Sequence, residues 1–205
     1  MHTLTRRGGV AALMVLVLAT FGLAAAPSAG AADVILPITW NINASTHLKN
    51  LNLDVTVPTG TFTGTVDLTT GAIQGNLNLP PASKTISFIG IPLATATFAM
   101  SAAGPISGHV DIAAMTATVN SSFNFKISSA TLSIAPWLNL VGNNCHGVTP
   151  ITVNMSGSIS LTGSSTFSST YTIPKLTGCG LATPLLNLVV PSSGNTFTAT
   201  FAPAS

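Results

Sequence analysis

Charge is what this chain has least of. Only 5% of its 205 residues are charged, glutamate is absent, and the only arginines are Arg6 and Arg7. Beyond Ala32 the charged side chains are Lys49, Lys84, Lys126, Lys175, Asp33, Asp54, Asp67 and Asp111. Nucleic-acid binding needs a basic surface for phosphates, and a disordered chain combines high charge with low hydrophobicity. The composition therefore disfavours both classes.

Catalytic motifs are missing as well. The sequence contains no glycine-rich phosphate loop, Cys-x-x-Cys motif, zinc-type histidine pair or Gly-x-Ser-x-Gly elbow. The nearest acid–base pairing is His109 with Asp111, which stand two apart in a predicted strand and so project from one face. With a serine they could form a hydrolytic triad, but a surface pair is the favoured interpretation. The sequence predicts no catalytic residue and no cofactor.

Asp67 and Asp111 occupy matching positions in two similar segments, which raises the question of a calcium site. Calcium takes several oxygen ligands, usually from clustered carboxylates. One aspartate per segment, replaced by Ser160 in a fainter third copy, is too few. An aspartate before a turn more often accepts hydrogen bonds from the local main chain. We therefore expect both residues to form turns, and we expect no metal site.

Cysteine is nearly absent too, with only Cys145 and Cys179 present. In an exported protein such a pair predicts a disulfide. Closing a loop of about 35 residues would stabilise the fold by about 4 kcal/mol on the chain-entropy model. The alternative is a metal site that also uses His146, but this spacing matches no standard zinc pattern.

The first 32 residues have the layout of a secretory signal peptide. Arg6 and Arg7 form a positive n-region, residues 10–26 are uncharged and mostly apolar, and small residues fill positions 29–32. Cleavage after Ala31 or after Ala32 fits equally well, and an uncleaved membrane anchor is the alternative. The paired arginines raise the twin-arginine route, although the residues after them favour the general route. The sequence predicts a secreted, extracellular or cell-envelope protein.

Apolar and polar residues alternate along nearly the whole remaining chain. The clearest run covers residues 117–128, and shorter runs cover 38–43 and 50–57. Because successive strand side chains face opposite sides, each run has one apolar and one polar face. About a dozen short strands with glycine and proline at the joints predict one all-β domain over residues 33–205, an antiparallel sandwich, barrel or prism. Short helical turns remain open at residues 136–138 and 184–186.

Parts of the chain match one another at a nearly constant spacing. Residues 60–68 match 104–112, and residues 136–141 match 184–189. These matches predict three degenerate units of about 45–50 residues, over 60–103, 104–152 and 153–202, preceded by a hairpin over 36–58. Each unit would begin with a hairpin, best seen at the turn residues 69–71. Chance similarity in a chain of low diversity is the alternative.

The second half carries short motifs with a recognisable pattern. They are N-C at 144–145, T-I-P at 172–174, T-G-C-G-L at 177–181 and T-P-L-L-N at 183–187. In these motifs the chain resembles uncharacterised secreted proteins of high-GC Gram-positive bacteria, and its earlier hairpins resemble theirs more loosely. The resemblance implies an exported, cysteine-paired β-domain, and it implies no activity.

Aromatic side chains are few, and three of them raise the question of a sugar site. Trp40, Trp137 and Tyr171 could form a stacking platform for a carbohydrate. Single aromatic side chains in alternating strands more often belong to the core. A core position is therefore the favoured interpretation for these residues.

The remaining hypotheses about function rest on high apolar content with almost no charge. The first is a non-catalytic envelope or extracellular protein that binds an apolar or lipid-like ligand in its β-scaffold. The second is a structural or adhesive surface module that self-associates or binds cell-wall polymer, since uncharged Ser/Thr/Asn faces suit edge-to-edge packing. The third is a membrane β-barrel, ranked lower because most runs are shorter than the roughly nine to eleven residues that a span requires.

Overall fold

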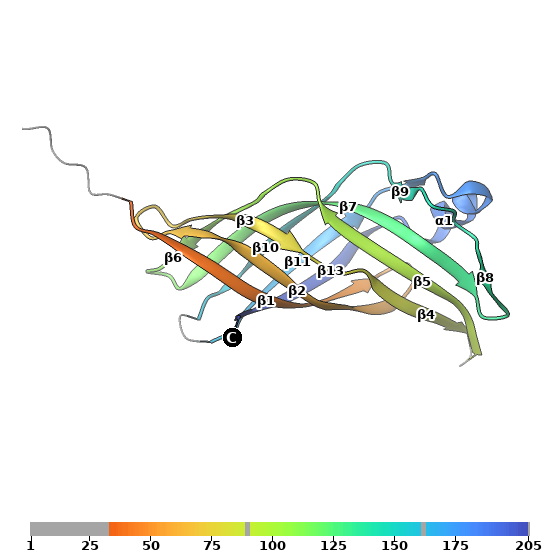
Figure 1. Ribbon diagram of the computed structural model, residues 1–205, viewed down its shortest axis with the longest axis horizontal. Helices are drawn as coiled ribbons and strands as arrows, with labels where there is room; N and C mark the ends of the chain where they lie inside the picture. The colour runs from red at the N-terminus through yellow and green to blue at the C-terminus, as the bar shows by residue number, and fades with distance from the viewer. Residues whose placement is uncertain (1–32, 89–90, 161–162, 205) are drawn as a thin grey trace, which may run out of the picture. The chain divides into compact units, whose positions relative to one another are not determined.

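The computed structural model describes residues 33–88, 91–160 and 163–204. From Asp33 onward the chain forms one compact unit, made almost entirely of β-strand (Figure 1). The predicted all-β class is therefore confirmed, while the predicted signal peptide, residues 1–32, lies outside the described residues. In the part of the chain that is described, no helix has the length and apolar character needed to cross a bilayer.

Eight antiparallel strands close into a barrel. They are β1 (Ile35–Leu48), β2 (Leu53–Asp67), β3 (Ala72–Asn78), β6 (Ile106–Asp111), β7 (Thr116–Leu132), β10 (Ile151–Ser158), β11 (Ser165–Ile173) and β13 (Ser192–Pro203). Each strand pairs with the next one of this set along the chain, and β13 pairs with β1. Of the three architectures left open by the alternation, the barrel is the one observed.

Three insertions interrupt this meander. Residues 79–105 carry β4 (Ala82–Phe88) and β5 (Ile91–Ala102), residues 133–150 carry β8 (Ala135–Asn139) and β9 (Cys145–Gly147), and residues 174–191 carry β12 (Leu176–Thr177), the 3-10 helix η1 (Gly180–Ala182) and α1 (Thr183–Val189). Because neighbouring strands run in opposite directions, all three insertions and the β1–β2 turn lie at one end of the barrel (Figure 1). We call this the extension end. The other end, which we call the turn end, carries the connections after β2, β6 and β10, the start of β1 and the end of β13.

Several strands are longer than the alternating runs suggested. β1 has 14 residues, β2 has 15 and β7 has 17. In β2 the turn-forming residues 58–60 lie inside the strand, where a β-bulge shifts the register against β1. The hairpin predicted over 36–58 therefore extends to Asp67. In β7 the first half pairs with β6 and β10, whereas the second half pairs with β5.

The strands present their apolar side chains to the interior and their polar side chains outward. In β7 the buried residues include Ala117, Val119, Phe123, Phe125 and Ile127. The residues between them, such as Thr118, Asn120 and Asn124, are exposed or only partly buried. The same alternation runs through β10 and β13. The outer wall of the barrel is thus lined with Ser, Thr and Asn, as the sequence predicted.

The predicted disulfide between Cys145 and Cys179 is confirmed. Both cysteines are fully buried, and the bond links the second insertion to the third beside the pairing of β9 with β12. The alternative of a metal site at Cys145, His146 and Cys179 is wrong, because both sulfur atoms are used in the bond. The Nδ1 atom of His146 lies 2.8 Å from the carbonyl oxygen of Asn144.

One of the two helical turns left open by the sequence is present. Residues 184–186 lie in α1, whereas residues 136–138 form β8. The Asn139 side chain holds β8 extended beside β7, because its Oδ1 accepts the N–H of Ala130 and its Nδ2 donates to the carbonyl of Ser128. Each predicted repeat unit contains one barrel hairpin and the insertion after it, while the repeat itself stays a prediction.

Candidate functional site

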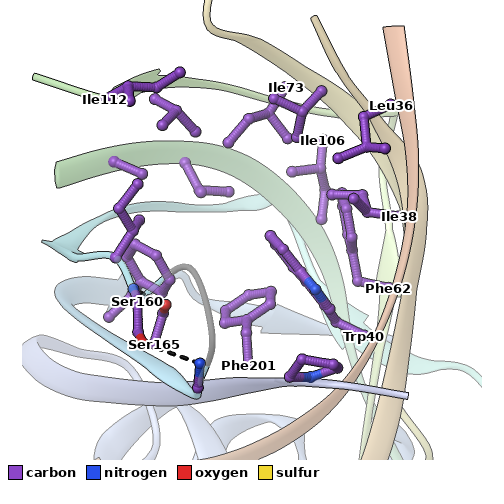
Figure 2. A pocket seen from close by; sticks show the side chains of 18 of the residues that line it. Leu36, Ile38, Trp40, Phe62, Ile73, Ile106, Ile112, Ser160, Ser165 and Phe201 are labelled. Carbon is purple, nitrogen blue, oxygen red and sulfur yellow. Dashed lines mark hydrogen bonds between the residues drawn. The ribbon is translucent and has the colours of Figure 1, made fainter. Parts of the chain in front are cut away.

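The barrel interior contains an apolar cavity at the turn end (Figure 2). Its volume is about 270 Å³. An apolar cavity of roughly 150 Å³ already accommodates a benzene-sized guest, and typical small-molecule sites begin at about 300 Å³. The cavity therefore has room for one small apolar molecule or one short chain segment.

Four aromatic rings line the inner part of the cavity, those of Trp40, Phe62, Phe167 and Phe201. The ring centroid of Trp40 on β1 lies 6.0 Å from that of Phe62 on β2 and 5.9 Å from that of Phe201 on β13. The Phe62 ring packs over Gly75 on β3, where an added Cβ would lie 2.5 Å from the ring. Glycine at this inward position thus lets the aromatic cluster extend across the barrel. The cluster separates the cavity from the core beneath the extension end.

Ala117 and Val119 of β7 line the cavity as well. Ala117 on β7 stands opposite Gly157 on β10, and Val119 stands opposite Gly108 on β6. At both glycines an added Cβ would meet a main-chain carbonyl of a neighbouring strand, that of Thr118 at Gly108 and that of Thr166 at Gly157, so glycine permits close approach of the strands. Branched side chains complete the wall, namely Ile38, Val66, Ile73, Ile106 and Val110. The described wall of the cavity thus combines the small Ala117 with branched side chains of moderate size.

Exposed apolar side chains surround the mouth of the cavity. Leu36 at the start of β1, Leu68 after β2 and Ile112 after β6 all line it. They are 48%, 44% and 46% exposed to solvent. Large apolar side chains held half in water around an apolar cavity are typical of an entrance for an apolar ligand.

The only hydroxyl groups on the described cavity lining belong to Ser160 and Ser165, where β10 connects to β11. The Ser165 Oγ accepts the N–H of Ser160 at 2.9 Å, and the Ser160 Oγ accepts the N–H of Gly163 at 3.0 Å. Each hydroxyl acts as acceptor in these bonds, so each keeps a hydrogen that it can donate. The pair could therefore orient one polar atom of a ligand at the mouth.

Two carboxylates flank the mouth without lining it. The Asp67 carboxylate accepts the Thr70 hydroxyl at 2.6 Å and the N–H of Thr69 at 2.8 Å, and these bonds lower its pKa below the ordinary 3.8. The Asp111 carboxylate accepts the N–H of Ala114 at 2.9 Å. Both aspartates thus cap their own turns, as predicted. Within the described residues, no three His, Cys, Asp or Glu side chains gather closely enough to hold a metal ion.

His109 and Asp111 share one face of β6, as their spacing predicted. Both are exposed, and no hydrogen bond or ion pair joins them among the contacts of the described residues. Neither side chain lines the cavity. The structure therefore does not bring these two residues together with a serine.

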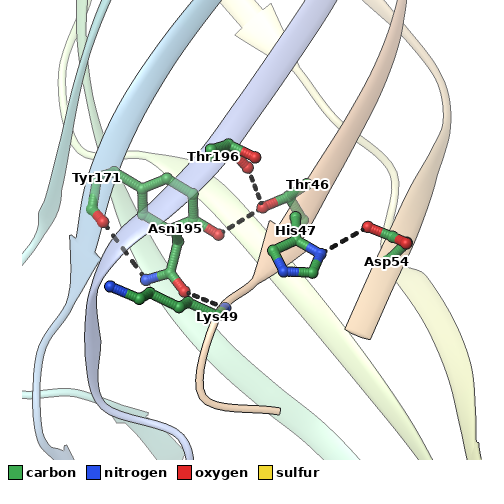
Figure 3. A network of polar contacts seen from close by, with 7 residues as sticks. All are labelled: Thr46, His47, Lys49, Asp54, Tyr171, Asn195 and Thr196. Atoms are coloured by element: carbon green, nitrogen blue, oxygen red, sulfur yellow. Dashed lines mark hydrogen bonds and ion pairs between the residues drawn. The ribbon is translucent and has the colours of Figure 1, made fainter. Parts of the chain in front are cut away.

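Sequence reasoning missed a different pair, His47 and Asp54. The His47 Nδ1 lies 2.8 Å from the Asp54 Oδ1, across the β1–β2 ladder at the extension end (Figure 3). The two residues are equidistant from the turn that joins the strands. Their equal distance from the turn is the sequence feature from which the pairing of His47 with Asp54 could have been predicted. Both side chains are solvent-accessible and distant from the cavity, so the pair belongs to the surface.

A buried polar network lies close to this pair (Figure 3). The Thr46 Oγ1 donates to the carbonyl of Thr196 at 2.8 Å and contacts the Tyr171 hydroxyl at 2.7 Å. The Asn195 side chain, fully buried, accepts the N–H of Lys49 and donates to the carbonyl of Ser192. Every polar atom of this amide is thus used within the fold, and the network ties β1, β11 and β13 together.

The favoured core position holds for two of the three aromatic residues. Tyr171 is buried, and Trp40 is half-buried in the cavity wall. For Trp137 the prediction is wrong, because this side chain is 83% exposed on β8. Alternation suggests a core position in a central strand, whereas β8 lies outside the barrel. The three rings stand on separate parts of the fold and form no common platform.

No protein-family model, curated protein or solved structure matches the chain. The resemblance to secreted proteins of high-GC Gram-positive bacteria therefore stays a prediction, and the chemistry of the cavity rests on the residues that line it.

Proposed function

We propose that this chain is an exported, non-catalytic protein that binds an apolar or lipid-like molecule in the turn-end cavity. The observation that carries the proposal is an apolar cavity of about 270 Å³ with a half-exposed rim of Leu36, Leu68 and Ile112. Keeping these side chains half in water has a free-energy cost. A ligand that covers them would recover it.

The ligand should be neutral at the end that enters. None of the described residues lining the cavity is titratable, and a buried charge without a partner is very costly. The nearest carboxylates, Asp67 and Asp111, would repel an anion at the mouth. A single hydroxyl or carbonyl group near Ser160 and Ser165 is the polar feature that the site can accommodate.

Three features support export. A disulfide between two buried cysteines is typical of proteins that fold in an oxidising compartment. The first 32 residues have the composition of a signal peptide. The compact unit begins at Asp33, directly after the expected cleavage positions.

The distribution of polar residues favours this proposal over a membrane β-barrel. The exposed positions of β7, β10 and β13 carry mostly Thr, Asn and Ser. A barrel that spans a bilayer presents an apolar band outward. Here the apolar side chains face the interior, where a ligand would meet them.

A matched pair of fluorescent probes tests the proposal. N-phenylnaphthylamine is neutral, and anilinonaphthalene sulfonate differs from it by one sulfonate. We expect the neutral probe to bind with enhanced emission and the sulfonated probe to bind at least about tenfold more weakly. Trp40 should transfer excitation to the bound probe, measured in a Trp137→Phe background so that Trp40 is the only tryptophan.

Two substitutions on one strand locate the binding. Ala117→Phe places a ring in the cavity and should abolish binding of the neutral probe. Thr118→Phe adds the same ring on the outer face and should leave binding unchanged, because Thr118 is exposed. Equal loss in both variants, or binding that survives Ala117→Phe, would contradict the proposed site. Circular dichroism of both variants establishes that the barrel has formed.

A further inference from the structure

Positive charge gathers at the extension end of the barrel. Lys49 lies in the β1–β2 turn, Lys84 on β4, Lys126 on the second half of β7 and Lys175 just before β12. These are all the cations beyond Ala32 apart from histidine. Asp33, Asp67 and Asp111 lie at the turn end, and Asp54 at the extension end is paired with His47. The two ends therefore carry opposite charge.

Exposed apolar side chains gather at the same end as the lysines. Trp137 and Leu138 lie on β8, Val148 follows β9, and Leu181, Leu185 and Leu188 lie on η1 and α1. We call these six residues the extension-end patch. Leu181 is fully exposed, and Trp137, Leu185 and Leu188 are 83%, 65% and 78% exposed.

The leucines of the patch stand on a helix that is fixed to the sheet. The Asn187 side chain accepts the N–H of Leu176 at 2.7 Å and donates to its carbonyl at 2.9 Å, which holds α1 against β12. Leu186 packs onto the core. Leu185 and Leu188 therefore point into solvent from a rigid support, with little conformational entropy to lose on binding.

One lysine contacts this patch directly through the main chain, and two others lie beside residues that adjoin it in the chain. The carbonyl of Lys175 accepts the N–H of Val148 at 2.9 Å. Lys126 stands opposite His146 in the pairing of β7 with β9. Beside Lys49, the Asn50 side chain donates to the carbonyl of Pro191, just after α1, at 2.8 Å. No acidic residue is present in any of the three insertions.

We propose that the extension end docks on the surface of an anionic lipid bilayer. The leucines of η1 and α1 and the Trp137 ring would enter the interface, where tryptophan is favoured. The bordering lysines would face the anionic headgroups. Opposite charges at the two ends orient the barrel, so that the cavity mouth at the turn end faces away from the bilayer. This inference does not depend on occupancy of the cavity.

Vesicle co-sedimentation tests the proposal. The protein is purified after export, with the N-terminus that it then carries. We expect binding to phosphatidylglycerol vesicles, little binding to phosphatidylcholine vesicles, and weaker binding in high salt. The emission of Trp137 should shift to the blue on binding, and Trp137→Phe should remove the shift. All variants carry the same N-terminus, so any contribution from it cancels in the comparison.

Matched double variants separate the docking end from the rest of the surface. Leu185→Ser with Leu188→Ser should weaken binding by at least about tenfold. Val34→Ser with Ile35→Ser, at the turn end, removes side chains of similar exposure, 58% and 60%, and should leave binding unchanged. Lys126→Gln and Lys175→Gln should each weaken binding about fivefold, without any effect on α1.

Other occupants of the patch give other results. Equal binding to both vesicle types would overturn the proposal that the bilayer must be anionic. Unchanged binding of the Lys126→Gln and Lys175→Gln variants would overturn it as well. A dimer in solution that the Leu185→Ser/Leu188→Ser variant dissociates, with no vesicle binding, would assign the patch to a second copy of the chain. Retention on isolated cell-wall polymer alone, with no vesicle binding, would also overturn the proposal.

Discussion

At the scale of single residues, the hydrogen bonds of Thr46 define the state of Tyr171. A threonine hydroxyl has one hydrogen, and Thr46 donates it to the carbonyl of Thr196. In the contact with Thr46, the Tyr171 hydroxyl must therefore be the donor. Burial of this hydroxyl raises the pKa of Tyr171 above the ordinary 10.0. The folded protein thus holds this proton more tightly than the unfolded chain does.

This difference predicts a loss of stability in alkali. Above a pH of about 10 the unfolded chain releases the proton while the native state retains it, so the free energy of unfolding falls until the pH passes the folded pKa. Tyr171→Phe should cost about 1 kcal/mol at neutral pH through the lost hydrogen bond, but it should lack this alkaline decline. Urea unfolding at several pH values measures both effects.

Tyr171 is the only tyrosine in the chain, which provides an independent check. Tyrosinate absorbance in the native state should appear at higher pH than in urea. If both titrations coincide, burial of the hydroxyl does not protect the proton, and the predicted alkaline decline would be absent.

At the scale of elements, we expect the disulfide to stabilise the insertions more than the eight strands of the barrel. The Cys145–Cys179 bond joins two insertions that lie outside the ring of eight strands. The Cys145→Ala/Cys179→Ala variant should lose about 4 kcal/mol of stability on the chain-entropy model. Hydrogen exchange should then accelerate first in β9, β12 and α1, where few ladder bonds protect the backbone. Uniform acceleration across β1 and β2 would show instead that the bond stabilises the whole barrel.

Elements with a strong local signal were predicted well from the sequence. Alternation identified which residues of β1 and β7 face the interior, because the period of two is a property of the backbone itself. The turn at Thr69–Gly71 and the disulfide also carry local signals. The lengths of the strands were not predictable, because Pro58 and Gly60 suggest a turn where the structure has a bulge within β2. The position of Trp137 depends on β8 leaving the barrel, which no local pattern indicates.

At the scale of the whole molecule, the cavity could not be predicted from the sequence. Its rim combines Leu36, Leu68 and Ile112, which come from three separate parts of the chain. Its wall combines side chains from strands that are far apart in the sequence, such as Ile38, Ala117 and Phe201. Period two assigns a residue to a face but does not assign one strand to another. High apolar content with little charge favoured an apolar ligand, which stays a proposal, whereas the apolar cavity itself is a feature of the fold.

Closure of the ring gives the chain a circular order, in which no strand need come first. Trp40 near the start of the ring pairs with Pro203 at its end, and about five residues of β1 separate that point from Ile35, roughly 17 Å at strand spacing. A flexible linker of about ten residues spans this distance. A permuted chain that begins at Ala114 and ends at Ala113 should therefore form the same barrel and bind the same neutral probe. Loss of folding in that chain would show that the order of synthesis matters to assembly, even though the finished ring has no beginning.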